Sequence, residues 1–270
     1  MNYFDAHYPY QLPPGRLHRF GVEPTDANER YLIQQWGVLD KETVSPSGVA
    51  YAAAAYDDCI ADLDEQIGKL IDLLRDRGNL DQTWLFVTSD HGEGFGEHAG
   101  VFGHGTSLYD TELHVPLIII PPGGVAAGQV VKEAVSLRDL PATIVDVVGQ
   151  AAGAPFPGAS LAGFCEKPSA AADQFSVSPS LAEVVPSDPR EGDYWTATRR
   201  LPPLGALKGR EWSYIRRETD GREALFRLNE DAKEHHNLAR DPSMGMIREQ
   251  MHKTLDGLTG GPLSPERFNR

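Results

Sequence analysis

An aspartate and three histidines fall in one short, glycine-rich stretch of the chain. Asp90 and His91 are adjacent, and His98 and His104 follow, the last with a glycine on each side. A carboxylate oxygen beside an imidazole nitrogen forms half of a plausible divalent-cation site of intermediate hardness. A histidine between two glycines is hard to explain by core packing. The stretch is therefore predicted to carry chemistry.

The elements around this stretch are those that must position it. Residues 83–88 are a short β-rich run, typical of a strand buried on both faces, and 115–120 form a second such run that ends at Pro121. Polar groups at the carboxyl end of a strand lie where open α/β sheets bind their ligands. The order of elements predicts an α/β fold.

Helices are expected before and after these strands. Apolar residues at spacings of three and four predict an amphipathic helix from 49 to about 77, ended by Gly78. A shorter helix is expected around 28–37. A third, over 139–148, is expected to begin with Asp139 as its cap and to stop at Gly149.

The C-terminal part has a different pattern. Residues 151–192 are rich in Ala, Gly, Pro and Ser and are interpreted as a connecting region. Alternating runs at 211–217 and 223–228 flank Asp220-Gly221, a hairpin turn signal. A helix around 243–258 should complete a small antiparallel sheet with one helix.

Composition excludes several classes of protein. Lys+Arg 25 against Asp+Glu 39 gives a formal net charge of −14, which disfavours binding to nucleic-acid phosphates or an anionic membrane surface. No stretch approaches the ~20 apolar residues of a membrane-spanning helix. Two cysteines, Cys59 and Cys165, cannot make a disulfide framework. No secretory signal is visible, so the sequence as given reads as cytoplasmic, and the compartment itself is left unknown.

Several segments together resemble the sulfatase family of the alkaline-phosphatase superfamily, in order and in spacing. The strongest are Thr88-Ser89-Asp90-His91-Gly92-Glu93, Gly96-Glu97-His98, Phe102-Gly103-His104-Gly105, Leu108-Tyr109 and Val115-Pro116-Leu117-Ile118-Ile119. Weaker ones are Phe4-x-x-His7-x-Pro9-Tyr10, Asp64-x-x-Ile67-Gly68, Asp139-Leu140-x-Ala142-Thr143 with Gly158-x-Ser160-Leu161, Leu225-Phe226-x-Leu228 and Glu234-x-x-Asn237-Leu238.

This resemblance implies a role for each candidate residue. Asp90 and His91 would hold a divalent cation, calcium by family habit, although manganese and zinc are not distinguished. His7 would bind the ester or protonate its leaving oxygen, and His104 takes the place where many sulfatases have a lysine contacting the sulfate. His98 and Glu93 would support these groups from outside the ligand set.

The resemblance also implies the fold and its division. The expected fold is α/β: an alkaline-phosphatase-like sheet flanked by helices, incomplete here, with a small C-terminal antiparallel sheet and helix. Residues 1–160 would be the C-terminal half of a catalytic domain, and 161–270 a connecting region with a small α+β subdomain. The family's nucleophile segment, Cys/Ser-x-Pro-x-Arg, is absent from residues 1–270, so a truncated chain with little or no sulfatase activity is expected.

Three functions remain open from the sequence. The first is hydrolysis of a small-molecule or carbohydrate sulfate or phosphate ester. The second is a non-catalytic, truncated or split protein that binds metal or a partner chain and self-associates through an exposed sheet edge. The third is a metal-dependent phosphoesterase or phosphoglycerol transferase with an upstream Thr or Ser nucleophile.

Other polar groups receive structural interpretations. Asp57-Asp58 and Arg216-Arg217 are expected on solvated faces, as is Arg199-Arg200, and His235-His236 on the surface. Cys59 is expected to be a small buried residue within a helix.

Overall fold

The computed structural model describes residues 1–21, 24, 26–98, 100–124, 129–152, 156–166, 171–172, 179–184 and 202–261. The chain forms two compact units. One consists of Met1–Val87, Glu93–His104 and Ile118–Gly124, and the other of Thr88–Gly92, Gly105–Leu117 and Val125–Arg270. Within the described ranges, no helix combines the length and apolar character that a membrane crossing needs.

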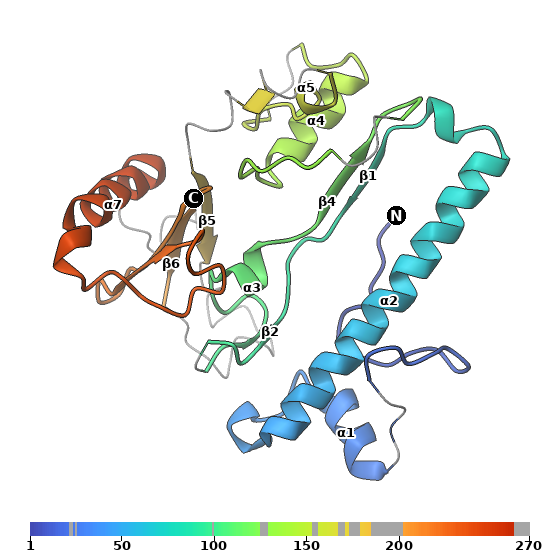
Figure 1. Ribbon diagram of the computed structural model, residues 1–270, viewed down its shortest axis with the longest axis horizontal. Helices are drawn as coiled ribbons and strands as arrows, with labels where there is room; N and C mark the ends of the chain where they lie inside the picture. The colour runs from blue at the N-terminus through green and yellow to red at the C-terminus, as the bar shows by residue number, and fades with distance from the viewer. Residues whose placement is uncertain are drawn as a thin grey trace, which may run out of the picture. The chain divides into compact units, whose positions relative to one another are not determined.

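A long helix, α2 (Pro46–Asp76), is the main element of the first unit (Figure 1). The Ser45 hydroxyl accepts from the Gly48 amide at 3.1 Å, and Pro46 stands at the start of the helix, where its missing amide proton is not needed. Gly78 follows the helix with φ +67°. The predicted amphipathic helix is therefore confirmed.

A shorter helix, α1 (Ala27–Gln35), packs beside the first part of α2 (Figure 1). Asp26 caps α1 by accepting from two backbone amides of its first turn. Between the two helices and the loop before them lies an aromatic-rich core. Its buried members are Tyr10, Ile33, Trp36, Ala52, Ala55 and Cys59. The expected burial of Cys59 is confirmed, and burial raises its thiol pKa to about 12.

Asp58 corrects the expectation of a solvated helix face. Its side chain is 1% exposed and accepts from the amides of Arg19 (2.5 Å), Phe20 (2.8 Å) and Gly21 (3.1 Å). His18 Nδ1 lies 2.9 Å from the same carboxylate. Asp57 does face solvent. The buried charge is stable because four donors surround it.

Strands β1 (Leu85–Thr88) and β4 (Leu117–Ile120) form a two-stranded sheet, at the positions predicted. The expectation that these strands are buried on both faces is wrong. Neither contains a fully buried residue, and Ile118 is 53% exposed. The reason is that each has only the other as a hydrogen-bonded neighbour among the residues that the structure describes.

The second unit contains a four-stranded antiparallel sheet in the order β5-β6-β7-β8 (Figure 1). The strands are β5 (Ser180–Val184), β6 (Leu204–Lys208), β7 (Trp212–Arg217) and β8 (Glu223–Arg227). The predicted hairpin around Gly221 is confirmed. Strand β5 lies in the region interpreted as a connection and β6 was not foreseen, because both runs are short and surrounded by loop-like composition.

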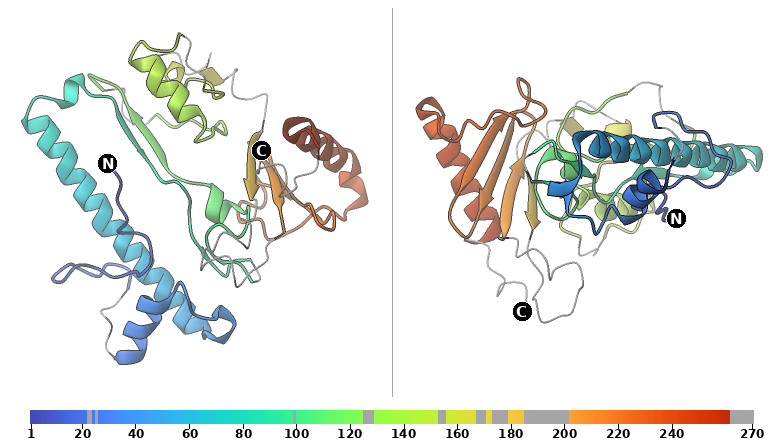
Figure 2. Two further views of the ribbon diagram at one scale, coloured as in Figure 1. Left: turned by 180° about the vertical axis from the view of Figure 1, so that it is seen from behind. Right: turned by 90° about the horizontal axis from the view of Figure 1, so that it is seen from below.

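Both faces of this sheet are covered. Helix α7 (Gly245–Thr259), predicted at 243–258, packs on one face, with Leu207, Tyr214 and Leu255 fully buried in that contact (Figure 2). The other face packs through Phe226 and Ile215 against Leu108 and Tyr109, next to the short helix α3 (Asp110–Leu113). Short 3-10 helices among the described residues are Lys41–Thr43, Leu80–Gln82 and Pro242–Met244.

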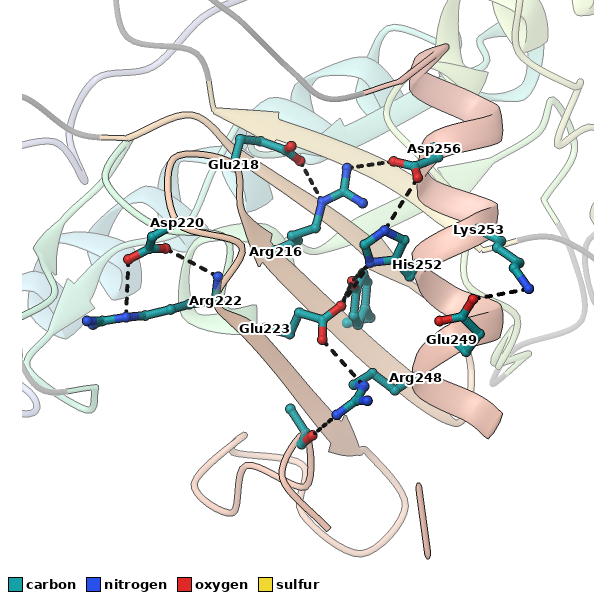
Figure 3. Close-up of polar contacts among 12 residues, drawn as sticks. Arg216, Glu218, Asp220, Arg222, Glu223, Arg248, Glu249, His252, Lys253 and Asp256 are labelled. Atoms are coloured by element: carbon teal, nitrogen blue, oxygen red, sulfur yellow. Dashed lines mark hydrogen bonds and ion pairs between the residues drawn. The ribbon is translucent and has the colours of Figure 1, made fainter. Parts of the chain in front are cut away.

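Between the sheet and α7 lies a chain of charged contacts (Figure 3). Arg216 is 4% exposed and pairs with Glu218 and Asp256, both at 2.8 Å. His252 contacts Asp256 at 3.4 Å and Glu223 at 3.0 Å. The interpretation of Arg216 as a solvated strand edge is therefore wrong. Arg199-Arg200 lie outside the described residues, and His235-His236 are exposed as expected.

Helix α4 (Asp139–Val147) matches the predicted third helix, but Asp139 is not its cap. The Asp139 carboxylate accepts instead from the amides of Ser136 (2.9 Å) and Ala159 (3.0 Å). Thr143 accepts from the Leu161 amide at 2.9 Å. These bonds fasten the loop before helix α5 (Gly163–Glu166) onto α4. The Asp139 and Gly158 motifs thus have a structural explanation.

Candidate functional site

The segment after β1 begins with a tight turn that holds Asp90 and His91. The Ser89 hydroxyl donates to the His91 carbonyl at 2.6 Å, and the Asp90 carboxylate accepts from the His91 amide at 3.1 Å. Gly92 continues the turn and donates to the Glu112 carbonyl at 2.8 Å. A Cβ on Gly92 would lie 2.2 Å from the Thr111 carbonyl oxygen, so this close approach requires glycine.

Asp90 and His91 lie together as the sequence predicts. Nε2 of His91 is 3.8 Å from Oδ1 of Asp90, and the side chains are 37% and 89% exposed. Metal–ligand distances are about 2.0–2.2 Å for zinc and 2.3–2.6 Å for calcium, so one ion can reach two donors at this separation. The pair therefore fits two ligands of a divalent cation. It does not form a larger cluster: across the described residues, no group of three or more His, Cys, Asp or Glu side chains could hold a metal ion.

Glu93 and His104 are brought together by a small hairpin. Strands β2 (Gly94–Phe95) and β3 (Phe102–Gly103) pair antiparallel, with Gly94 opposite Gly103. Glu93, just before Gly94, and His104, just after Gly103, therefore lie side by side. His104 Nδ1 is 3.1 Å from Oε2 of Glu93. The glutamate side chain is 3% exposed and the histidine 25%. A buried carboxylate thus holds a partly exposed imidazole.

His7 lies against His104 in the same unit. Their ring centroids are 5.2 Å apart in an edge-on arrangement, and His7 Nδ1 is 2.8 Å from the Tyr8 carbonyl oxygen. The resemblance implies that both histidines bind the ester, and this role stays a prediction with which their contact is consistent. Both are partly exposed, so a ligand can reach them.

Aromatic side chains pack beside this histidine pair. Tyr10 lies in contact with the rings of Trp36, Tyr56 and Phe95. Burial, and then the negative charge of Glu93, raises the pKa of Tyr10 well above its ordinary value, so its hydroxyl is neutral at physiological pH. The same two causes, in the same order, raise the pKa of Tyr8.

His98 and Glu97 belong to the turn between β2 and β3. The Glu97 carboxylate accepts from the Phe95 amide at 2.6 Å, and the His98 carbonyl accepts from the Val101 amide at 2.9 Å. Both contacts stabilise the turn. A supporting role for His98 remains a prediction.

Glu112 was missed by sequence reasoning. It is 3% exposed, and its carboxylate accepts from the Ser107 hydroxyl at 2.5 Å and the Thr106 amide at 3.2 Å. Its carbonyl holds Gly92, next to His91. A single residue therefore ties the Asp90-His91 turn to the segment after His104. The only signal in the sequence is a glutamate between two predicted strands.

A buried ion cluster fixes the start of α3 to the C-terminal sheet. Lys208 Nζ contacts Asp110 at 2.8 Å and Glu234 at 2.5 Å, and Glu234 also accepts from the Asp110 amide at 2.7 Å. The Glu234 side chain is completely buried. The C-terminal motif that begins at Glu234 is thereby explained as structural.

Comparison with known proteins places the chain in a family. Residues 5–150 match the sulfatase family, which is more than half of the sequence. The chain belongs to the sulfatase family, whose members generally use a divalent metal. The resemblance inferred from its motifs is confirmed.

Relatives match over part of their own length. The choline-sulfatase of Rhizobium meliloti (strain 1021) is 31% identical over 199 residues, which are 74% of this chain and 35% of that protein. Arylsulfatase K of Canis lupus familiaris is 32% identical over 136 residues, which are 50% of this chain and 23% of that protein. The chain thus spans about a quarter to a third of the length of these curated relatives.

Solved structures confirm the fold. The phosphonate monoester hydrolase of Agrobacterium radiobacter superposes with a TM-score of 0.71 at 24% identity, over 94% of this chain and 55% of that one. A protein solved with its substrate D-glucosamine-2-N,6-O-disulfate gives a TM-score of 0.62 at 20% identity, over 79% of this chain and 41% of that one. The predicted mixed α/β fold of the alkaline-phosphatase type is therefore confirmed.

Proposed function

We propose that this chain carries cation-binding and anion-binding residues of a hydrolase that cleaves sulfate or phosphate esters. The observation that carries the proposal is the contact between His7 and His104, two partly exposed imidazoles from distant parts of the sequence, with ring centroids 5.2 Å apart. Imidazoles can donate hydrogen bonds to an anion and transfer protons near neutral pH. Membership of the sulfatase family supports the same reaction class.

Asp90 and His91 are the proposed cation ligands. When bound, a divalent cation withdraws electron density from the ester oxygens and stabilises the charge that develops in transfer. The role of the two residues is to present a carboxylate oxygen and an imidazole nitrogen 3.8 Å apart. Calcium is the proposed ion from family habit, and zinc and manganese remain alternatives.

His7 and His104 are the proposed ester-binding residues. His7 binds the ester and protonates its leaving oxygen, because a general acid must change protonation state near the working pH. His104, when protonated, donates a hydrogen bond from its second ring nitrogen where the family often has lysine. Glu93 supports His104 through the 3.1 Å contact, and His98 supports the loop.

Sulfate and phosphate esters are both candidate substrates. Relatives and structural neighbours include choline-sulfatase, arylsulfatase K, a 2-O glycosaminoglycan sulfatase and phosphonate monoester hydrolases. His91, where many sulfatases have asparagine, favours a phosphoesterase as the second candidate. Residues 1–270 contain no Cys/Ser-x-Pro-x-Arg segment, so we expect little or no turnover of an aryl sulfate by this polypeptide alone.

Metal analysis tests the cation ligands. Wild-type protein, Asp90→Ala and His91→Ala should be dialysed against calcium, manganese or zinc and their bound metal measured. Both variants should lose bound metal. Asp64→Ala, on an exposed position of α2, is the matched control and should retain it. Unchanged metal content in Asp90→Ala would show that Asp90 is not a ligand.

A non-catalytic protein that self-associates is the rival proposal. It is supported by the half-buried strands β1 and β4 and by the exposed Ile118. An apolar sheet surface of this kind favours association with another chain. Sedimentation over a range of concentrations should then show oligomers that Ile118→Lys disrupts. A compact monomer at every concentration would contradict the rival.

A further inference from the structure

Three of the predicted site histidines direct the same ring nitrogen toward an oxygen. That nitrogen is Nδ1, and the oxygens belong to two backbone carbonyls and one carboxylate. The contacts are His7 to the Tyr8 carbonyl at 2.8 Å, His91 to the Gly92 carbonyl at 2.8 Å and His104 to the Glu93 carboxylate at 3.1 Å.

These contacts determine where a neutral imidazole carries its proton. Carbonyl and carboxylate oxygens accept hydrogen bonds and do not donate them, so Nδ1 must be the donor in each pair. A neutral imidazole has one N–H, and the nitrogen without it is a ligand and acceptor. We propose that His7, His91 and His104 are held as the Nδ1–H tautomer, and that Glu93 is the positioning residue that does this for His104.

The consequence is that Nε2 of each neutral ring is an acceptor, which suits His91 as a cation ligand. His7 and His104 can donate to an anion through Nε2 only after that nitrogen takes up a second proton, which makes the ring an imidazolium. For His91 the ligand role agrees with the geometry, because Nε2 is the atom that lies 3.8 Å from the Asp90 carboxylate. Tautomer selection through the other ring nitrogen is a common way of orienting a histidine that binds metal or transfers a proton.

Glu93 differs from the other two acceptors. His7 and His91 each contact the backbone carbonyl of the following residue, which no side-chain substitution removes. His104 uses a side chain from across the β2–β3 hairpin, buried to 3% exposure. The orientation of His104 can therefore be changed by mutation, while the two carbonyl contacts stay in place.

Histidine-selective ¹⁵N NMR of the full chain tests this proposal. Two-bond ¹H–¹⁵N correlations, recorded in alkaline solution on the neutral imidazoles, identify which ring nitrogen bears the proton. Assignment uses His7→Gln, His91→Gln and His104→Gln. The expected result is a protonated Nδ1 in all three histidines of the wild-type protein.

Variants at residue 93 isolate the role of the glutamate. Glu93→Ala should move His104 to a mixture dominated by Nε2–H, as in a free imidazole side chain, while Glu93→Gln keeps an oxygen acceptor and should retain Nδ1–H. Glu97→Gln, at the exposed turn of the same hairpin, should change nothing. His18, held by Asp58, is the internal reference for an intact fold.

Two results would overturn the proposal. One is a wild-type His104 that carries its proton on Nε2, and this measurement stands even if Glu93→Ala does not fold. The other is a folded Glu93→Ala protein with an unchanged His104 tautomer.

The identity of the ligand rests on the proposed function and is tested separately. Titration with inorganic sulfate in acid, where Nε2 carries a proton that it can donate, should shift the Nε2 resonance of His104 in wild type and less in Glu93→Ala. If the tautomers are as proposed but sulfate shifts no Nε2 resonance, the anion-binding assignment of His104 fails while the positioning role of Glu93 stands.

Discussion

Replacing Asp58 with asparagine should lower the stability of the first unit far more than the same change at the neighbouring, exposed Asp57. Each carboxylate oxygen has two donors: Oδ1 accepts from the Arg19 and Phe20 amides, and Oδ2 from Gly21 and His18. Asparagine keeps one oxygen but places an amide NH₂ against the other two donors. The shape is conserved while the charge and half of the acceptors are lost.

The size of the effect follows from these contacts. Hydrogen bonds to a charged group contribute about 1.5–3 kcal/mol and neutral ones about 1, so the retained pair weakens by roughly 1 kcal/mol. Leaving buried donors without an acceptor costs about 1–3 kcal/mol more. The expected total is about 3 kcal/mol, which corresponds to a fall in Tm of roughly 6–12 °C when the whole 270-residue chain unfolds cooperatively.

Urea and thermal unfolding of the full chain measure this loss, and its pH dependence tests the cause. Burial by itself would raise the pKa of Asp58, but hydrogen bonds from Phe20, Arg19, His18 and Gly21 hold it below the ordinary value. A lowered folded pKa contributes stability above the unfolded value of about 3.9. The difference between wild type and variant should therefore be full near neutral pH and shrink as pH falls through the folded pKa.

Asp57→Asn is the control, because Asp57 is exposed one residue away on the same helix. It should change stability by no more than about 0.5 kcal/mol. Equal effects of the two substitutions, or an Asp58→Asn loss that persists unchanged in acid, would refute the account of a buried, fully hydrogen-bonded carboxylate.

Two further substitutions have clear expectations. Lys208→Met leaves the buried Glu234 carboxylate without its cation and should lower the free energy of unfolding in urea by about 3–5 kcal/mol. The control Lys253→Met removes one partner of an exposed helix pair and should lower it by under about 0.5 kcal/mol. Similar losses in the two variants would contradict the buried ion cluster. Gly92→Ala forces a Cβ to within 2.2 Å of the Thr111 carbonyl oxygen. It should weaken cation binding at the adjacent His91 at least tenfold, as measured by calorimetry. An unchanged affinity would show that the turn does not need glycine.

Elements with local signals were predictable from the sequence. Helix α2 has a capping serine, regular apolar spacing and a terminating glycine, and the hairpin at Gly221 has its own turn residues. Strand β6 has no such signal, because Leu204–Lys208 becomes a strand only through its pairing with β5 and β7. The spacing of apolar residues within one segment does not reveal pairing with strands elsewhere in the chain.

Some residues of the candidate site and its surroundings were likewise predictable from local sequence, and others were not. Asp90, His91 and His104 were recognisable by residue type and glycine spacing. The buried charges of Asp58, Arg216 and Glu112 were not, because their burial depends on partners that the fold supplies. Asp58 binds amides some forty residues earlier in the chain, and no local pattern around it distinguishes it from the exposed Asp57.

The β2–β3 hairpin offers a place to attach a reporter beside the histidines. The contact between Glu93 and His104 is set by the two paired residues of each strand, so the length of the connecting turn does not enter into it. Gly100 is exposed with open space around its α-carbon, whereas Gly96 is crowded by the Phe102 ring. A short tag or fluorophore-bearing peptide inserted at Gly100 would give up the bond between the Val101 amide and the His98 carbonyl but keep the strand pairing, and it would sense ligand binding at close range.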